Sequence, residues 1–198
     1  MFSLKSVSAI ALSIIVVAAS ITPATAGLVF DHGSRQWVLE SELPVRTPRS
    51  RSAIRKEVVE YQTSHKPGTI VIETEERRLY LVLEDGKALK YGIGVGRDGF
   101  TWSGTHRITR KAEWPGWTPP PAMRKRVPDL PAYMEGGPDN PLGARALYIG
   151  STLYRVHGTS EPWSIGQAVS SGCIRLTNDD VTDLYERVEV GALIVVNH

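Results

Sequence analysis

The stretch Ser170-Ser171-Gly172-Cys173-Ile174-Arg175-Leu176, with Val156-His157-Gly158-Thr159 upstream, decides the fold and the chemistry of this chain. Cys173 is the single cysteine among 198 residues, so no disulfide forms within the chain. The thiolate is the attacking species in nucleophilic catalysis, whereas a free thiol has a pKa of about 8.5. A neighbouring group must lower this pKa or accept the proton, and an imidazole is suited to both tasks. The pattern predicts a cysteine nucleophile with His157 as its base.

A single cysteine is more often a buried, unreactive thiol, because free cysteine packs as a small apolar residue. The surrounding motifs favour the reactive interpretation. Beside the two stretches above, the chain has Ser-x-Gly-Gln at 164–167, Gly-Ile-Gly-Val-Gly at 92–96 and Asn-Pro-Leu-Gly-Ala-Arg at 140–145. Together they resemble the catalytic domain of the L,D-transpeptidase (YkuD-like) family, over about residues 68–196. Many members carry Ser-His-Gly-Cys, and this chain has Ser171 in place of that histidine.

The resemblance implies a mainly β fold with one or two helices, a mixed β-sheet sandwich with a loop, or lid, over the active-site groove. It implies a peptidoglycan stem tetrapeptide as donor, attacked at the L-centre carbonyl of its third residue with release of D-Ala. A side-chain amine of another stem (a 3→3 cross-link), an amine of an outer-membrane protein, and water all remain open as acceptors. Carbapenem-type inhibitors are expected to acylate the cysteine, and neither a metal nor an organic cofactor is expected.

Four residues are predicted to carry the catalysis. Backbone N–H groups around Gly172 and Cys173 are suited to stabilise a tetrahedral oxyanion, and glycine lets a substrate approach the backbone closely. The family's catalytic base matches His157, so the departure at Ser171 concerns a residue that shapes the site. The resemblance also implies that a backbone carbonyl around Gly158 orients the imidazole.

Five residues are predicted to contact substrate. Arg175 is suited to bind a carboxylate through parallel hydrogen bonds, with support of the loop as the alternative. Ser171 and Thr159 adjoin the catalytic pair in the sequence, and Trp117 and Tyr133 belong to the predicted lid.

The predicted lid spans residues 114–141, a segment with eight prolines. So much proline predicts neither a regular helix nor a central strand. A long irregular segment within a compact domain is typical of a lid or binding loop, and the resemblance places one here. A static surface loop, held down by its tryptophans, is the alternative.

The first 26 residues have the features of a secretory signal. Lys5 precedes an almost wholly apolar run over residues 7–19, and Ala24-Thr25-Ala26 fits a small-x-small cleavage site. The run is shorter than the ~20 residues that a spanning helix needs, and an uncleaved anchor is the alternative. No cysteine follows this run at the predicted mature N-terminus, which argues against a lipid anchor. We expect export to the periplasm or cell envelope, with no transmembrane segment after cleavage.

Charge and cysteine usage narrow the function classes. The formal charge is +2 for the whole sequence and falls to +1 without Lys5, which argues against a nucleic-acid binder. A lone thiol in an exported protein is unusual, because oxidising compartments favour paired cysteines, so this thiol is expected to be reactive. Residues 27–66 contain prolines and a basic cluster and predict an extended, solvated lead-in. Binding of that cluster to anionic wall polymer or lipid is the alternative.

Residues 67–198 are predicted to form the catalytic domain, mostly β with one helix. Asp85-Gly86 is typical of a hairpin turn, and Thr177 followed by acidic residues is typical of a helix start. The predicted strands cover residues 69–74, 78–83, 88–95, 104–114, 145–149, 152–156 and 192–196.

Other function classes stay open beside the transpeptidase. Sortase-like enzymes also use an exported cysteine and histidine, but they are not expected to carry the Ser-Gly-Cys-Ile-Arg string. Papain-like wall hydrolases place the cysteine before the histidine, whereas His157 precedes Cys173 here. A wall-binding module with an inactive centre is the non-enzymatic alternative, and the presence of both residues argues against it.

Overall fold

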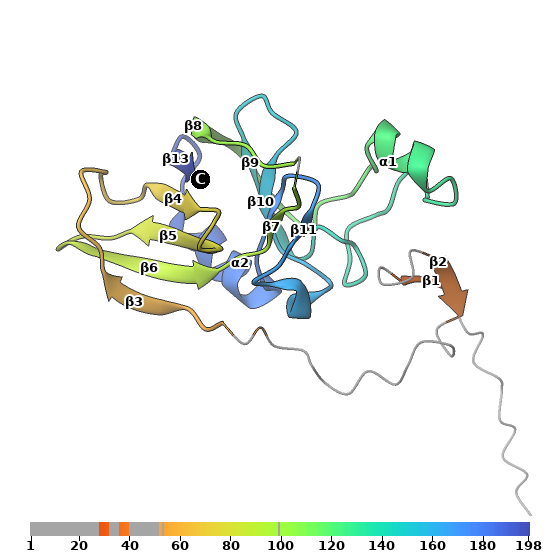
Figure 1. Ribbon diagram of the computed structural model, residues 1–198, viewed down its shortest axis with the longest axis horizontal. Coiled ribbons are helices and arrows are strands. Elements are labelled where there is room, and N and C mark those ends of the chain that lie inside the picture. Colours follow the sequence, from red (N-terminus) through yellow and green to blue (C-terminus); the bar gives the residue numbers. More distant parts are fainter. Residues whose placement is uncertain (1–27, 32–35, 40–51, 53, 99) are drawn as a thin grey trace, which may run out of the picture. The chain divides into compact units, whose positions relative to one another are not determined.

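The computed structural model describes residues 28–31, 36–39, 52, 54–98 and 100–198 (Figure 1). The predicted signal peptide lies outside these residues. The chain divides into two compact units, Met1–Leu43 and Pro44–His198. In the first, β1 (Leu28–Asp31) and β2 (Gln36–Leu39) form an antiparallel pair, so part of the predicted extended lead-in is β-structure. The β-branched and aromatic residues of both segments favour this state.

The second unit is built on a nine-stranded sheet with the order β12-β10-β9-β8-β13-β4-β5-β6-β3. Its pairings are antiparallel except for β10 with β12 and β13 with β4, so the sheet is mixed. A separate two-stranded sheet joins β7 and β11 in parallel. The predicted mainly β architecture is confirmed. The strands are β3 (Glu57–Glu60), β4 (Ile70–Glu73), β5 (Arg78–Val82), β6 (Lys87–Gly92), β7 (Val95–Gly96), β8 (Gly104–Glu113), β9 (Arg145–Ile149), β10 (Arg155–His157), β11 (Ala168–Ser170), β12 (Ile174–Arg175) and β13 (Leu193–Asn197).

The predicted helix is α2 (Asn178–Arg187), which packs against the core. The Thr177 hydroxyl accepts a hydrogen bond from the Asp180 N–H at 3.1 Å, as the sequence predicted for its N-cap. Val181 and Leu184 face inward and are both fully buried. They join one continuous apolar core with buried strand residues, including Ile72, Leu79, Tyr91, Ile108, Leu147, Ile149, Val156 and Ile194.

The turn at Asp85-Gly86 takes positive φ at both positions, 57° and 66°, as predicted. Two other local predictions differ from the structure. The strand predicted over 152–156 begins later, at Arg155, because the Thr152 N–H donates to the Ile149 carbonyl at 3.1 Å and closes a turn. The segment predicted to be a lid contains a short helix, α1 (Pro121–Arg126), where none was predicted. Its proline stands at the first helical position, where the missing N–H forfeits no hydrogen bond.

The second compact unit begins before residue 67. β3 pairs antiparallel with β6 and so adds an edge strand to the sheet. The Ile54 side chain lies against Gly92, where an added Cβ would come within 2.6 Å of it. Residues 54–60, predicted to be a solvated lead-in, are therefore part of this unit.

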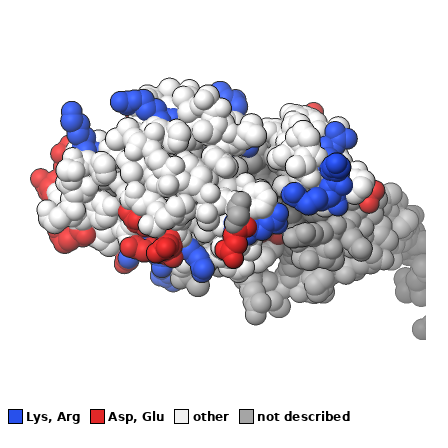
Figure 2. Space-filling view, turned by 45° about the horizontal axis from the view of Figure 1, so that its top comes forward, with Lys and Arg blue, Asp and Glu red and all other residues white. Residues whose placement is uncertain are grey.

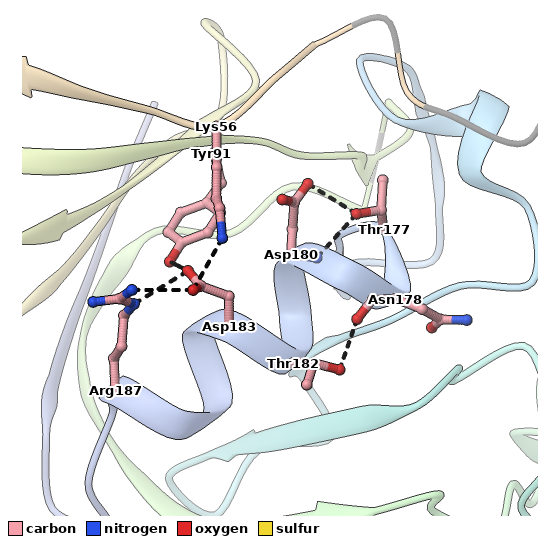
Figure 3. A network of polar contacts seen from close by, with 8 residues as sticks. All are labelled: Lys56, Tyr91, Thr177, Asn178, Asp180, Thr182, Asp183 and Arg187. Carbon is pink, nitrogen blue, oxygen red and sulfur yellow. Dashed lines mark hydrogen bonds and ion pairs between the residues drawn. The ribbon is translucent and has the colours of Figure 1, made fainter.

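Asp183 of α2 is the centre of a polar network that ties this edge to the helix (Figure 3). Its carboxylate accepts hydrogen bonds from the Tyr91 hydroxyl at 2.7 Å and the Arg187 guanidinium at 3.1 and 3.2 Å, and lies 2.9 Å from Lys56 Nζ. Burial raises the pKa of Asp183, but the hydrogen bonds from Arg187, Tyr91 and Lys56 outweigh it and bring the pKa to about 2.

We expect Asp183→Asn to lower the free energy of unfolding at pH 7 by about 1–3 kcal/mol, because the hydrogen bonds to a charged acceptor are lost. The folded pKa of about 2 lies below the unfolded value of about 3.9. The contribution of this carboxylate is therefore complete above the unfolded pKa and is lost as the pH falls through the folded one. Urea denaturation across this range measures the difference, which should shrink toward low pH. Asp179→Asn, one turn earlier and exposed, is the control. Equal free energies of unfolding for the two variants at pH 7 would contradict the prediction.

Candidate active site

Strands β10 and β12 lie side by side and bring the predicted catalytic side chains to one face of the sheet. Val156 pairs with Ile174, and His157 pairs with Arg175. The first pair is 0% and 1% exposed and belongs to the core. Successive strand residues point to opposite faces, so the second pair lies on the face away from this core contact. By the same alternation we expect Cys173, which directly precedes β12, on that face.

His157 is held in a defined orientation at the end of β10. It is only 4% exposed, and Nδ1 lies 2.6 Å from the Gly158 carbonyl oxygen, the contact that the resemblance implied. A carbonyl accepts only, so Nδ1 carries the proton and Nε2 keeps the lone pair of a base. Burial and then the charge of Arg175 lower the pKa of His157 to about 3. The imidazole is therefore neutral at neutral pH.

Cys173 follows the loop that returns from His157. Its Sγ lies 4.0 Å from the Leu153 carbonyl oxygen. Burial raises the pKa of the thiol, against the lowering effects of the nearby Arg155 and Arg175. The resting pair is thus a neutral thiol and a neutral imidazole. Of the two routes to a thiolate considered from the sequence, this favours proton acceptance by His157 during attack.

The backbone before the nucleophile is braced by Ser170. Its hydroxyl donates to the Cys173 carbonyl at 2.6 Å and accepts from the Gly172 N–H at 3.1 Å. Gly172 was predicted as an oxyanion donor, but its N–H already has this internal partner. No hydrogen bond of the Cys173 N–H is found in the described part of the chain, so this group is the donor that the loop offers.

An aromatic pair supports the same backbone from the other side. The Trp102 indole N–H donates to the Gly172 carbonyl at 2.8 Å. The Trp102 ring stacks on Tyr154 with centroids 4.6 Å apart and an interplanar angle of 2°. Sequence reasoning missed both residues, because Trp102 lies 70 positions from Gly172 and no local pattern connects them.

Arg175 has a protein partner within the site. Its guanidinium lies 3.2 Å from the Glu161 carboxylate, and the two side chains are 12% and 15% exposed. Its backbone N–H and carbonyl exchange 2.8 Å hydrogen bonds with Gly94. Of the two roles predicted for Arg175, these contacts provide a structural basis for support of the loop.

Asn178 anchors the segment that follows His157. Its side-chain oxygen accepts hydrogen bonds from the N–H groups of Ala144, at 2.9 Å, and Thr159, at 3.2 Å. Thr159 is 2% exposed, and its hydroxyl accepts from the Glu161 N–H at 3.0 Å. Thr159, predicted to contact substrate, is therefore buried and hydrogen-bonded to the loop itself. Sequence reasoning read Asn178 only as a helix start.

The remaining predicted substrate residues lie in less enclosed places. Ser171 is half-buried in the loop before the nucleophile. In the predicted lid segment, Tyr133 is 57% exposed, while the Trp117 backbone exchanges two 2.8 Å hydrogen bonds with Met134. Figure 2 shows basic side chains gathered over α1, which ends in Arg124, Lys125 and Arg126.

Among the residues that the structure describes, no group of three or more His, Cys, Asp or Glu side chains is arranged to hold a metal ion. None of the helices that these described residues form is long and apolar enough to cross a membrane.

The family model and the most similar curated relatives indicate one family. The family model YkuD, the L,D-transpeptidase catalytic domain, matches residues 67–196. The probable L,D-transpeptidase ErfK/SrfK of Escherichia coli (strain K12) is 43% identical over 136 residues, which are 64% of this chain and 43% of that protein. The probable L,D-transpeptidase YbiS of the same strain is 42% identical over 134 residues, 63% of this chain and 43% of that protein. The match thus spans less than half the length of these relatives.

Two solved structures share the fold. One from Brucella melitensis, described as a probable carnitine operon oxidoreductase caia, is 44% identical with a TM-score of 0.51, over 71% of this chain and 91% of that chain. An L,D-transpeptidase from Enterococcus faecium has 18% identity and a TM-score of 0.50, over 67% of this chain and 50% of that chain. The second similarity concerns the fold alone. With the family model covering most of the second unit, this chain belongs to the family of L,D-transpeptidase (YkuD) catalytic domains.

Proposed function

We propose that this protein is an exported, cysteine-dependent L,D-transpeptidase that acts on peptidoglycan stem peptides in the periplasm or cell envelope. The observation that supports it most is the parallel register of β10 and β12, which pairs His157 with Arg175, so that strand alternation puts the side chain of Cys173 on the face of His157. The Gly158 carbonyl, 2.6 Å from Nδ1, favours the tautomer in which Nε2 keeps the lone pair of a base. Family membership makes the transpeptidase class the natural setting for this pair.

In the proposed acylation, His157 Nε2 accepts the thiol proton while Cys173 Sγ attacks the L-centre carbonyl of the third stem residue. The Cys173 N–H donates to the resulting oxyanion. When the tetrahedral intermediate collapses, the bond to the nitrogen of D-Ala breaks, and His157 returns the proton to that amine. D-Ala leaves, and the rest of the stem remains on Cys173 as a thioester.

In the second step, an acceptor attacks the thioester and regenerates the thiol. His157 takes a proton from the attacking amine, and the sulfur leaves as the new amide forms. A stem side-chain amine gives a 3→3 cross-link, an amine of an outer-membrane protein gives protein attachment, and water gives L,D-carboxypeptidase activity. We propose the amine acceptors first, with the carboxypeptidase as the second candidate.

Substrate contacts are proposed for residues at the rim of the pair. The half-buried Ser171 adjoins the nucleophile, and the lid supplies the aromatic surface of Trp117 and the exposed Tyr133. Thr159 and Arg175 reach substrate in this scheme only through the loop that they support, since each is engaged with Glu161.

Mass spectrometry of purified disaccharide-tetrapeptide after incubation with the mature protein tests the function. Loss of D-Ala that depends on Cys173 is the expected result, with Cys173→Ala as the control. A dimer mass indicates cross-linking, and a hydrolysed tripeptide indicates the carboxypeptidase. An unchanged donor, both alone and with an added amine acceptor, would contradict the proposal and favour a wall-binding module.

The pH dependence of acylation tests the role of His157 as a base. Because its folded pKa is about 3, below the ordinary value, the imidazole stays unprotonated as the pH falls from 8 to 5. We expect the rate of acylation by a carbapenem to change less than about threefold, whereas an imidazole of pKa 6.5 would lose about 30-fold at pH 5. Intact-protein mass spectrometry measures this rate. A midpoint near pH 6.5 would contradict the lowered pKa.

A further inference from the structure

The two arginines of the site differ in how their charge is balanced. Arg175 is paired with the Glu161 carboxylate at 3.2 Å. In the part of the chain that the structure describes, no carboxylate forms an ion pair with Arg155. The Arg155 guanidinium instead donates to the Leu153 carbonyl at 3.2 Å and lies 5.1 Å from the centre of the Tyr148 ring. Each of the two arginines has a buried Nε without a hydrogen-bond partner, so the difference between them is the carboxylate. The site therefore holds one positive charge without a resident counter-charge.

The strand register places this charge beside the nucleophile. Val156 is opposite Ile174 in the parallel pair, and Arg155 and Cys173 are the residues that precede them. Extending the register by one position sets Arg155 next to Cys173, on the face that also carries His157. Leu153 links the same two side chains, because its carbonyl contacts both the Arg155 guanidinium and Cys173 Sγ.

The two arginines also act on different members of the catalytic pair. Burial raises the pKa of Cys173, and the charge and hydrogen bonds of Arg155 are the next largest effects, ahead of Arg175. For His157 the order is reversed: after burial, Arg175 lowers the pKa more than Arg155 does. Arg155 is thus directed mainly at the sulfur, and Arg175, whose charge Glu161 offsets, mainly at the imidazole.

We propose that Arg155 positions Cys173 and stabilises the negative charge that develops on its sulfur as the proton passes to His157. Before attack, the thiol and the imidazole are neutral, and the positive charge of Arg155 is unbalanced. Proton transfer creates a thiolate and an imidazolium, and the thiolate then supplies the counter-charge that Arg155 lacks. This inference takes its chemical setting from the proposed function, but it concerns a property of the thiol alone.

Alkylation of Cys173 by iodoacetamide, followed by mass spectrometry from pH 6 to 11, tests the proposal without any peptidoglycan donor. In Arg155→Met, we expect the midpoint of the pH profile to rise by about one unit or more, and alkylation at pH 7.5 to slow by about tenfold. Arg155→Lys keeps a charge and should fall between the variant and the wild type. Iodoacetamide is neutral, so the rate does not report attraction of the reagent to the arginine.

Arg110→Met is the matched control. Arg110 of β8 lies 3.6 Å from the centre of the same Tyr148 ring, so its loss removes a comparable cation–π contact without removing a charge beside Cys173. This control should keep the wild-type alkylation midpoint. A purely structural role for Arg155 predicts the same unchanged midpoint in both methionine variants, and that result would overturn the proposal.

Two further comparisons distinguish a failure of this proposal from a variant that does not fold and from a failure of the proposed function. If Arg155→Met does not fold, as judged by circular dichroism, Arg155→Gln and Arg155→Lys decide the matter, and wild-type midpoints in both would overturn the proposal. A shifted midpoint together with an unreactive tetrapeptide would refute the proposed function while the role of Arg155 stands. Normal D-Ala release by the wild type, together with an unshifted alkylation midpoint in Arg155→Met, would support the proposed function and refute the role of Arg155.

Discussion

The Cys173→Ala variant is expected to release no D-Ala from a tetrapeptide donor, with a rate at least about 10⁴-fold below that of the wild type. Without sulfur there is no thioester, and water held near His157 cannot replace the transfer of the stem to an amine. The fold should survive, because the Ser170 hydroxyl holds the backbone carbonyl of residue 173, which alanine keeps, and Sγ approaches the Leu153 carbonyl oxygen only to 4.0 Å. Product masses and thermal unfolding, measured on the same preparations, check both statements.

The His157→Ala variant is the informative companion of that experiment. It keeps the thiol but loses the group that accepts its proton, so we expect acyl transfer to fall by about 10²–10⁴-fold. Because His157 is 4% exposed, this change also leaves a cavity, and its unfolding temperature must be measured beside its activity. Substantial turnover by Cys173→Ala would remove the covalent mechanism, whatever the histidine variant does.

Local signals in the sequence predicted the elements whose structure depends on neighbouring residues. The Asp85-Gly86 turn and the Thr177 cap are examples, since each needs only a few adjacent positions. The sheet order is different in kind. β13 pairs in parallel with β4, with Ile194 opposite Ile70, and no periodicity states which distant strands will pair. The same reason explains why β3 was read as a solvated lead-in, because its place at the sheet edge comes from pairing with β6.

The residues of the candidate site divide in the same way, into those that local motifs predict and those that only the fold brings near. Cys173 and His157 were predicted from residue type and motif, and their neighbourhood then follows from the pairing of two short strands. Trp102 and Asn178 could not be found this way, because each acts through one hydrogen-bonding atom on a backbone far along the chain. Arg155 is an intermediate case. Alternation along β10 puts it on the face of His157, but only the partner strand shows that the face includes the thiol.

Gly172→Ala is expected to produce the second large effect, because the backbone beside the nucleophile leaves no room for a methyl group. Gly172 has a φ of +104°, a conformation that costs an L-residue about 1–2 kcal/mol. Its Cβ would lie 2.5 Å from a ring carbon of Tyr154 and 3.2 Å from the Phe100 carbonyl oxygen. Tyr154 is stacked on Trp102, whose indole N–H holds the Gly172 carbonyl, so the ring cannot move without disturbing the loop.

We expect this variant to lose about 2–4 kcal/mol of unfolding free energy and at least about 100-fold in acylation rate, because a displacement near 1 Å misaligns the nucleophile. Gly191→Ala is the matched control, since Gly191 has a φ of +96° but nothing within 4 Å of the added Cβ. It carries the backbone cost without the clash, so it should lose about 1–2 kcal/mol and keep full activity. Comparison of urea denaturation and carbapenem acylation in the two variants separates the effects. Equal acylation rates in the two variants would contradict this prediction. They would mean that the Tyr154 and Trp102 rings move to make room for the methyl group and that the position of Cys173 does not depend on these rings.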